Sequence, residues 1–167
     1  TSNAAAESFR GEMAKWVNAC PTNTWLWRPN ALITYRVLAP KNLARVFFND
    51  LSLFKANGVA GYDFDNYFDN YASMGLMYYA ISKAALNFDE VDYDVIFNDF
   101  CEKGFGPAAS PIKEYYAHQE AVYNAAAQQP SNNEYYYVLN LDLDYLQRRL
   151  DAARELAQGN SEILARI

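Results

Sequence analysis

Two short apolar runs, each ending in polar and aromatic residues, stand out in the first half of the chain. They predict strands over 24–28 and 59–64. The segment between them predicts a helix over 40–56, ended by a left-handed cap at Gly58, because apolar residues recur at helical spacing: Leu43, Phe47, Leu51 and Phe54. A right-handed crossover makes the two strands neighbours, or near neighbours, in a parallel sheet.

The rest of the apolar pattern is helical. The other predicted helices cover 4–18, 71–86, 92–104, a segment from Ser110, and a long segment from about Leu139. Two strands alone cannot form a stable parallel sheet, and an intact β/α barrel needs roughly 250 residues. The sequence therefore predicts a mainly helical α/β fragment. In it, residues 1–87 form the last two βα units of a TIM (β/α)8 barrel, and residues 88–167 form a C-terminal α-helical region.

Composition and charge exclude several classes of function. The chain has 167 residues, a formal net charge of -6 and a sequence pI of about 4.7, which argues against nucleic acid as a partner. No apolar run approaches the roughly 18–20 residues of a membrane-spanning helix, so no membrane insertion is expected. The first residues do not resemble a signal peptide and include no initiator Met, so we expect an excerpt or a processed product of a longer protein.

The potential metal ligands are sparse. Cys20 and Cys101 lie too far apart in sequence to suggest a disulfide framework, and His118 is the only histidine. A calcium loop after the second predicted strand fails at Tyr67 and Phe68, where the motif needs Asp or Asn and then Gly. We therefore expect no metal and no cofactor.

Aromatic residues are the strongest compositional bias, with 14 Tyr, 10 Phe and 3 Trp. Most are expected in the core, and a few are candidates for a carbohydrate cleft, because flat rings suit the C–H face of a sugar. Trp25 and Trp27 share one face of the first strand and either stack on a sugar at the barrel mouth or fill the barrel core. Arg28 either reaches a sugar hydroxyl or carboxylate, or forms a surface ion pair.

A second group of candidates lies at the end of the second predicted strand. Asp63 and Asp65 either accept sugar hydroxyls or are solvated in a loop, whereas Asp69 is expected to cap the helix that begins at residue 71. Aromatic walls from Tyr62 and Tyr67 complete this group. The predicted substrate-binding set is therefore Trp25, Trp27, Arg28, Tyr62, Asp63, Asp65 and Tyr67.

The stretch from Phe9 to Tyr116 resembles the bacterial family known as domain of unknown function 4838, which overlaps glycoside hydrolase family 163 in the wider group of barrel glycosidases. The most specific matching run is Asp99-Phe100, four further residues, and Phe105-Gly106-Pro107-Ala108-Ala109. Its local meaning is a helix end, a turn and a new helix, so it indicates kinship and not catalysis. Other matching pieces are Trp16, Thr24-Trp25-Leu26-Trp27, Asp50-Leu51, Gly58-Val59, Asp92-Tyr93-Asp94 and Glu114-Tyr115-Tyr116.

The resemblance implies the C-terminal portion of a glycoside hydrolase-like protein that acts on glycans, with N-acetylhexosamine among the expected sugars. It also implies a secreted, periplasmic or cell-surface location and, as a partner, the remainder of the barrel. No adjacent acid pair follows a predicted strand, so we expect the catalytic acids outside this chain and sugar-binding groups within it. Two alternatives stay open: a non-catalytic carbohydrate-binding or helical scaffold module, and a self-standing helical domain with no role in sugar chemistry.

Overall fold

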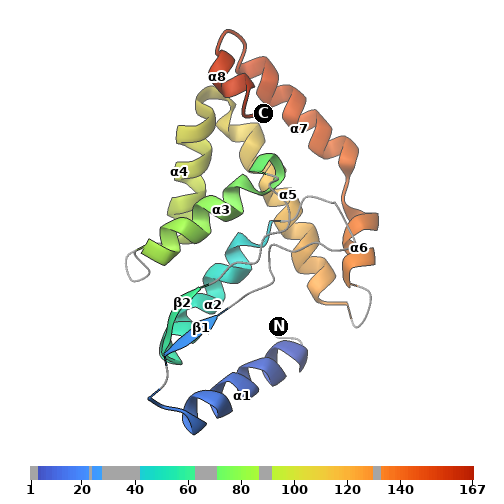
Figure 1. Cartoon of the computed structure of the whole chain (residues 1–167). Helices are drawn as coiled ribbons and strands as arrows, with labels where there is room; N and C mark the ends of the chain where they lie inside the picture. Colours follow the sequence, from blue (N-terminus) through green and yellow to red (C-terminus); the bar gives the residue numbers. More distant parts are fainter. Residues whose placement is uncertain (1–3, 23, 28–41, 63–70, 87–91, 130–132) are drawn as a thin grey trace.

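The computed structural model describes residues 4–22, 24–27, 42–62, 71–86, 92–129 and 133–167, and 80% of this part of the chain is helical. Figure 1 shows α4, α5 and α7 converging at the end of the molecule where α8 and the C-terminus lie, with α1 and the strands at the opposite end. The elements in chain order are α1 (Ala4–Ala19), β1 (Trp25–Trp27), α2 (Ala44–Ala56), β2 (Val59–Tyr62), α3 (Tyr71–Leu86), α4 (Tyr93–Phe105), the 3-10 turn η2 (Gly106–Ala108), α5 (Ala109–Ala127), α6 (Asn133–Asn140), α7 (Leu143–Leu156) and α8 (Ser161–Leu164).

The predicted barrel fragment is wrong. Within the described residues the sheet has two strands, of three and four residues, and no ring of βα units is present. The prediction assumed that such a sheet needs further strands for support. In the structure helices support it, because Val59 of β2 packs against the buried side chains of α2 and α3. The mainly helical character predicted from the spacing is confirmed.

The predicted strand–helix–strand unit is confirmed as a local feature. β1 and β2 run parallel and are hydrogen-bonded neighbours, with Trp27 paired with Tyr62 in the register. The helix α2 connects them, and Gly58 follows it with φ 72°, a left-handed conformation in which glycine avoids the Cβ clash. The pattern of the sequence therefore identified this unit correctly, although it did not identify what surrounds it.

Two hydrophobic clusters form the core. The larger, which we call the α5 cluster, includes Phe100 and Phe105 of α4, Tyr115 and Tyr116 of α5, and buried residues of α6, α7 and α8. The smaller, the α2–α3 cluster, is built from those two helices and the first turn of α4: Ala44, Phe47, Leu51, Phe54, Met74, Met77, Ala80, Ile81, Ala84, Tyr93 and Ile96. Tyr79 and Phe97 pack against both clusters, so the two meet along α3 and α4.

A charged network on the surface ties α2 to the larger cluster. Arg45 of α2 pairs with Glu120 of α5 and with Asp94 of α4, each at 2.5 Å. Its guanidinium also lies 4.3 Å from the ring centroid of Tyr93, at cation–π distance. One side chain of α2 thus links that helix to α4 and α5, which follow it much later in the sequence.

The helix boundaries follow local capping chemistry. Asp92 caps α4 as predicted, accepting from the backbone N–H of Asp94 at 2.8 Å. The single long helix predicted from about Leu139 is instead α6 and α7, because Asp142 caps a new helix by accepting from Tyr145 N–H at 2.8 Å. His118 is partly buried: its Nε2 accepts from the N–H of Asp142 at 3.3 Å, and its ring centroid lies 4.9 Å from that of Tyr145.

Two predicted boundaries fall on residues that the structure does not describe. The predicted helix start at Pro40 lies outside the described residues, and α2 begins at Ala44. The predicted domain boundary between residues 87 and 88 lies outside them as well. Both stay predictions.

Candidate functional site

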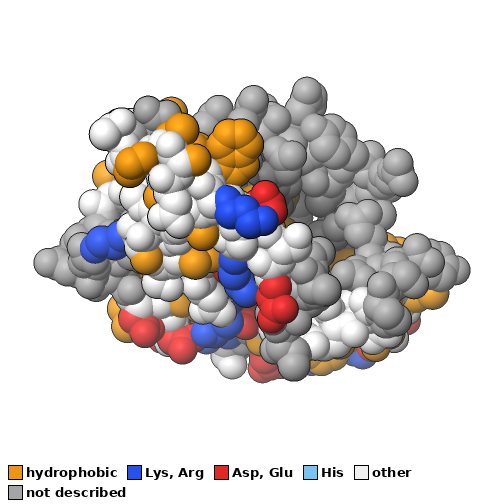
Figure 2. Space-filling model, turned by 90° about the horizontal axis from the view of Figure 1, so that it is seen from below, with side chains coloured by type: hydrophobic (Ala, Val, Ile, Leu, Met, Phe, Trp, Pro, Cys, Tyr) orange, Lys and Arg blue, Asp and Glu red, His pale blue; other side chains and the backbone are white. Residues whose placement is uncertain are grey.

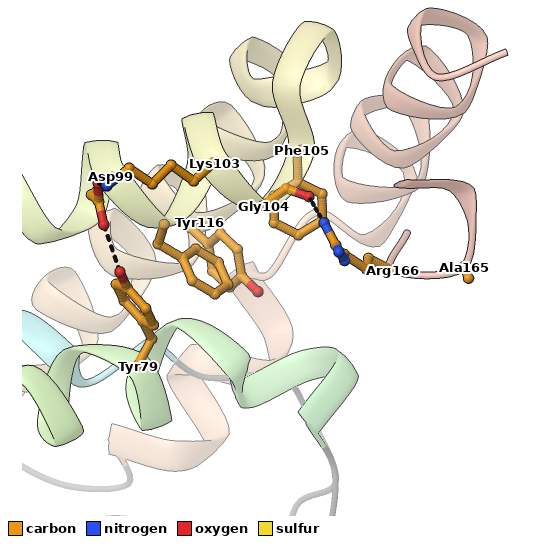
Figure 3. Close-up of a pocket in the computed structure, with 9 residues that line it drawn as sticks. Tyr79, Asp99, Lys103, Gly104, Phe105, Tyr116, Ala165 and Arg166 are labelled. Atoms are coloured by element: carbon orange, nitrogen blue, oxygen red, sulfur yellow. Dashed lines mark hydrogen bonds and ion pairs between the residues drawn. The ribbon is translucent and has the colours of Figure 1, made fainter. Parts of the chain in front are cut away.

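A pocket of about 490 Å³ opens between α3, α4, α5 and the turn that follows α8 (Figure 3). Its volume falls in the range of roughly 300–1,000 Å³ that is typical of small-molecule sites. Figure 3 shows side chains of these elements directed toward a common space. The lining residues are Tyr79, Asp99, Phe100, Lys103, Gly104, Phe105, Tyr116, Ala165 and Arg166.

An aromatic wall forms the apolar side of the pocket. The ring of Phe100 lies 5.5 Å from that of Tyr79, 5.7 Å from that of Phe105 and 5.9 Å from that of Tyr116, measured between centroids. The last two contacts are edge-to-face, the geometry that aromatic pairs favour. Because Phe100, Phe105 and Tyr116 are buried in the α5 cluster, the core of the protein holds this wall in place.

One side of the pocket carries an ionised carboxylate. Asp99 Oδ2 accepts from the hydroxyl of Tyr79 at 2.5 Å, and Asp99 Oδ1 pairs with Lys103 Nζ at 2.5 Å. The Lys103 ammonium, followed by the Tyr79 hydroxyl, lowers the pKa of Asp99 below its usual range. Asp99 is therefore a hydrogen-bond acceptor at neutral pH and not a proton donor.

The opposite side is formed by the end of the chain. Arg166 Nη1 donates to the carbonyl oxygen of Gly104 at 2.8 Å, and Arg166 also pairs with Glu162. This turn is held in place because Asn160 caps α8 and Ile163 is buried beside η2. Gly106, at the start of η2, has a φ of 48°, a backbone conformation that other residues rarely adopt, so glycine is favoured at this turn.

The side chains of the pocket can therefore bind a ligand through hydrogen bonds, charge and ring contacts. The pocket combines a carboxylate that accepts, a guanidinium that donates, and aromatic rings between them (Figure 3). Within the described residues, no group of three or more His, Cys, Asp or Glu side chains is arranged to hold a metal ion. A search of the same residues finds no helix whose length and apolar character would let it cross a membrane.

The structure describes only part of the site that the sequence predicted. Trp25 is half-buried, and its indole Nε1 is buried with no hydrogen-bond partner among the described residues. Trp27 and Tyr62 are placed by their backbone alone, side by side in the register of the sheet. The other four predicted residues lie outside the described residues: Arg28, Asp63, Asp65 and Tyr67. The expected cap at Asp69 lies outside them as well. The sheet lies at the opposite end of the molecule from α8, and the turn that follows α8 lines the pocket (Figure 1).

The pocket contains residues that sequence reasoning singled out for another purpose. Asp99, Phe100 and Phe105 belong to the run that carried the family resemblance, and that run supplies both the carboxylate and the centre of the aromatic wall. A carboxylate next to an apolar ring near a helix end was the sequence signal that could have indicated this site. Tyr79 and Arg166 had no comparable local signal, because they reach the pocket only through the packing of α3 and α8.

No family model, no curated protein and no solved structure matches this chain. The resemblance to domain of unknown function 4838 therefore stays a prediction. The same holds for the hydrolase relationship, the bacterial origin and the location outside the cytoplasm that the resemblance implied.

Proposed function

We propose that this chain is a non-catalytic glycan-binding domain that holds a sugar residue in the pocket between α3, α4 and α5. The observation that carries the proposal is an ionised Asp99 beside the aromatic wall around Phe100. A sugar ring presents an apolar C–H face that suits such a wall, and its hydroxyls donate well to a charged carboxylate.

Binding without cleavage fits the pocket better than hydrolysis does. Most glycoside hydrolases place two carboxyl groups on either side of the scissile bond, roughly 5–9.5 Å apart, one of them protonated as the acid. Within the part of the chain that the structure describes, Asp99 is the one carboxyl group that lines this pocket, and its lowered pKa keeps it ionised. A link to a larger glycoside hydrolase-like protein rests on the sequence resemblance.

The test is a glycan-array screen followed by calorimetric titration of the best-bound oligosaccharide. The Asp99→Asn variant is expected to bind about tenfold more weakly, because a hydrogen bond to a charged acceptor becomes one to a neutral amide. Wild-type affinity is expected to hold as the pH falls from 7 to 5, since the pKa of Asp99 lies below its usual range.

The matched control for this measurement is Asp151→Asn. Asp151 is an exposed carboxylate on α7 that pairs with Arg154, and it does not line the pocket. Its replacement is expected to leave the affinity unchanged. If no glycan binds, or if both variants weaken binding equally, the proposal is wrong.

A second candidate function, an oligomerisation scaffold, is favoured by one observation. Exposed apolar side chains lie on α1 and β1: Phe9 is 41% exposed, Trp16 62% and Leu26 69%. Figure 2 views the molecule from the side of α1 and shows hydrophobic side chains distributed over that face. Only Met13 of α1 packs against the α2–α3 cluster, within the described residues, and the Arg10–Asp50 ion pair of 3.2 Å adds a polar link to α2.

If this face joins two copies of the chain, the protein is expected to be a dimer at micromolar concentration and Trp16→Ser to shift it to monomer. Size-exclusion chromatography with light scattering measures both. Leu143→Ser is the control, because Leu143 is similarly exposed, at 64%, but lies on α7. A wild-type monomer at all concentrations would exclude the scaffold role and leave glycan binding unaffected.

A further inference from the structure

The pocket is polar at two ends that differ in hydrogen-bonding character. Figure 3 shows Tyr79, Asp99 and Lys103 on one side, Arg166 beside Gly104 on the other, and the ring of Tyr116 between them. Asp99 is ionised and only accepts, whereas a guanidinium only donates. A ligand that binds both Asp99 and Arg166 must therefore carry donors that face Asp99 and an acceptor that faces Arg166.

The donors at the Arg166 end are only partly used. A guanidinium carries five N–H groups, and Arg166 uses one for the Gly104 carbonyl and one for Glu162. The carboxylate of Glu162 is 78% exposed, and such exposed ion pairs are weak and readily exchanged. A carboxylate of a ligand can therefore take up the remaining N–H groups of Arg166 or replace Glu162.

The charge of the lining supports an anionic group on the ligand. Among the described residues, the lining carries two cations, Lys103 and Arg166, and one carboxylate, Asp99, although the chain as a whole has a net charge of -6. Lys103 neutralises Asp99 at 2.5 Å, which leaves Arg166 as the second cation of the lining. A ligand amine would meet both cations, and a neutral sugar would leave Arg166 with the exposed carboxylate of Glu162 as its charged acceptor.

Asp99 retains acceptor capacity for hydroxyl groups. An ionised carboxylate has about four lone-pair positions. Tyr79 occupies one on Oδ2 and Lys103 one on Oδ1. An inorganic phosphate at neutral pH offers few donors to this end, whereas a sugar offers several hydroxyls.

From this asymmetry we infer that the pocket selects an acidic sugar, a hexuronate residue. Its hydroxyls bind Asp99, its ring lies on the aromatic wall, and its carboxylate binds Arg166. This inference rests on the proposed glycan-binding function and specifies the substrate class of the same site.

The test compares ligands that differ in charge alone. Calorimetric titrations of the full chain use oligogalacturonates and oligoglucuronates, each against its methyl ester, together with the matched neutral oligosaccharides. Wild-type protein is expected to bind one of the acids at least about tenfold more tightly than its ester, the gain from one charge-assisted bidentate pair.

The variant Arg166→Gln is expected to abolish this preference while retaining binding to the ester. Arg166→Lys, which keeps the charge without the planar fork, is expected to retain part of it. Arg154→Gln, on the surface of α7, is the matched control and is expected to leave the preference unchanged. Circular dichroism verifies that each variant is folded.

The outcomes separate the two proposals. Equal affinity for acid and ester, or a preference that persists in the Arg166→Gln variant, overturns the hexuronate inference and leaves glycan binding in place. Absence of binding to every acidic and neutral sugar overturns both proposals. If the Arg166→Gln variant does not fold, the wild-type comparison of acid with ester and the Arg166→Lys variant still decide the question.

Discussion

Replacing Phe100 with alanine is expected to lower the free energy of unfolding by about 3–5 kcal/mol, the usual cost of removing a buried phenylalanine ring. Phe100 is 9% exposed, and its ring contacts those of Tyr79, Phe105 and Tyr116 at centroid distances below 6 Å. The substitution leaves a cavity at the point where the pocket wall joins the core. Urea unfolding monitored by circular dichroism measures the change.

The control lies on the same helix. Val95 is 66% exposed, so Val95→Ala is expected to change the free energy of unfolding by less than about 0.5 kcal/mol. Phe100→Leu retains most of the apolar volume, so its loss of unfolding free energy is expected to lie between those of Val95→Ala and Phe100→Ala. A loss below about 1 kcal/mol for Phe100→Ala would mean that this ring does not lie in a close-packed core.

The thiol of Cys101 is expected to resist alkylation in the folded protein. It is 0% exposed, and burial raises its pKa to about 12, whereas an ordinary cysteine has a pKa of about 8.5. At pH 8 the reactive thiolate is then about one ten-thousandth of the thiol population. Iodoacetamide is expected to modify Cys101 at least about a thousandfold more slowly than it does in the unfolded chain.

The chain contains its own reference for this measurement. Cys20 is free and partly exposed, so it is expected to react in the folded protein, and both thiols are expected to react in guanidinium chloride. Peptide mass spectrometry over a time course separates the two sites. Equal rates for the two thiols in the folded protein would show that α4 does not bury Cys101.

Local structure could be predicted from the sequence where local chemistry decides it. The helical stripe ending in Phe54 and the glycine at residue 58 gave α2 and the start of β2, because spacing and a left-handed cap act over a few residues. Asp92 likewise marked the start of α4. The break between α6 and α7 was not predicted, because apolar residues continue at helical spacing on both sides of the cap at Asp142.

The architecture could not be predicted in the same way. A parallel strand pair suggested a barrel by a general rule about sheets, yet Val59 is held by helices, and no local pattern showed that α2 and α3 would cover it. The candidate site also depends on how distant elements pack. Tyr79, Asp99 and Arg166 line one pocket only because of how α3, α4 and the turn after α8 are packed. Their spacing in the sequence therefore could not predict that they share a site.

The position of Tyr79 has a practical consequence for work with shorter pieces of this protein. Of the seven aromatic and charged residues in the described lining of the pocket, a recombinant fragment starting at Asp92 would keep six: Asp99, Phe100, Lys103, Phe105, Tyr116 and Arg166. It would discard Tyr79, whose phenol donates to Asp99. A cut near the predicted boundary between residues 87 and 88 therefore divides the lining of the pocket. Only polypeptides that include α3 contain the full described lining of the pocket.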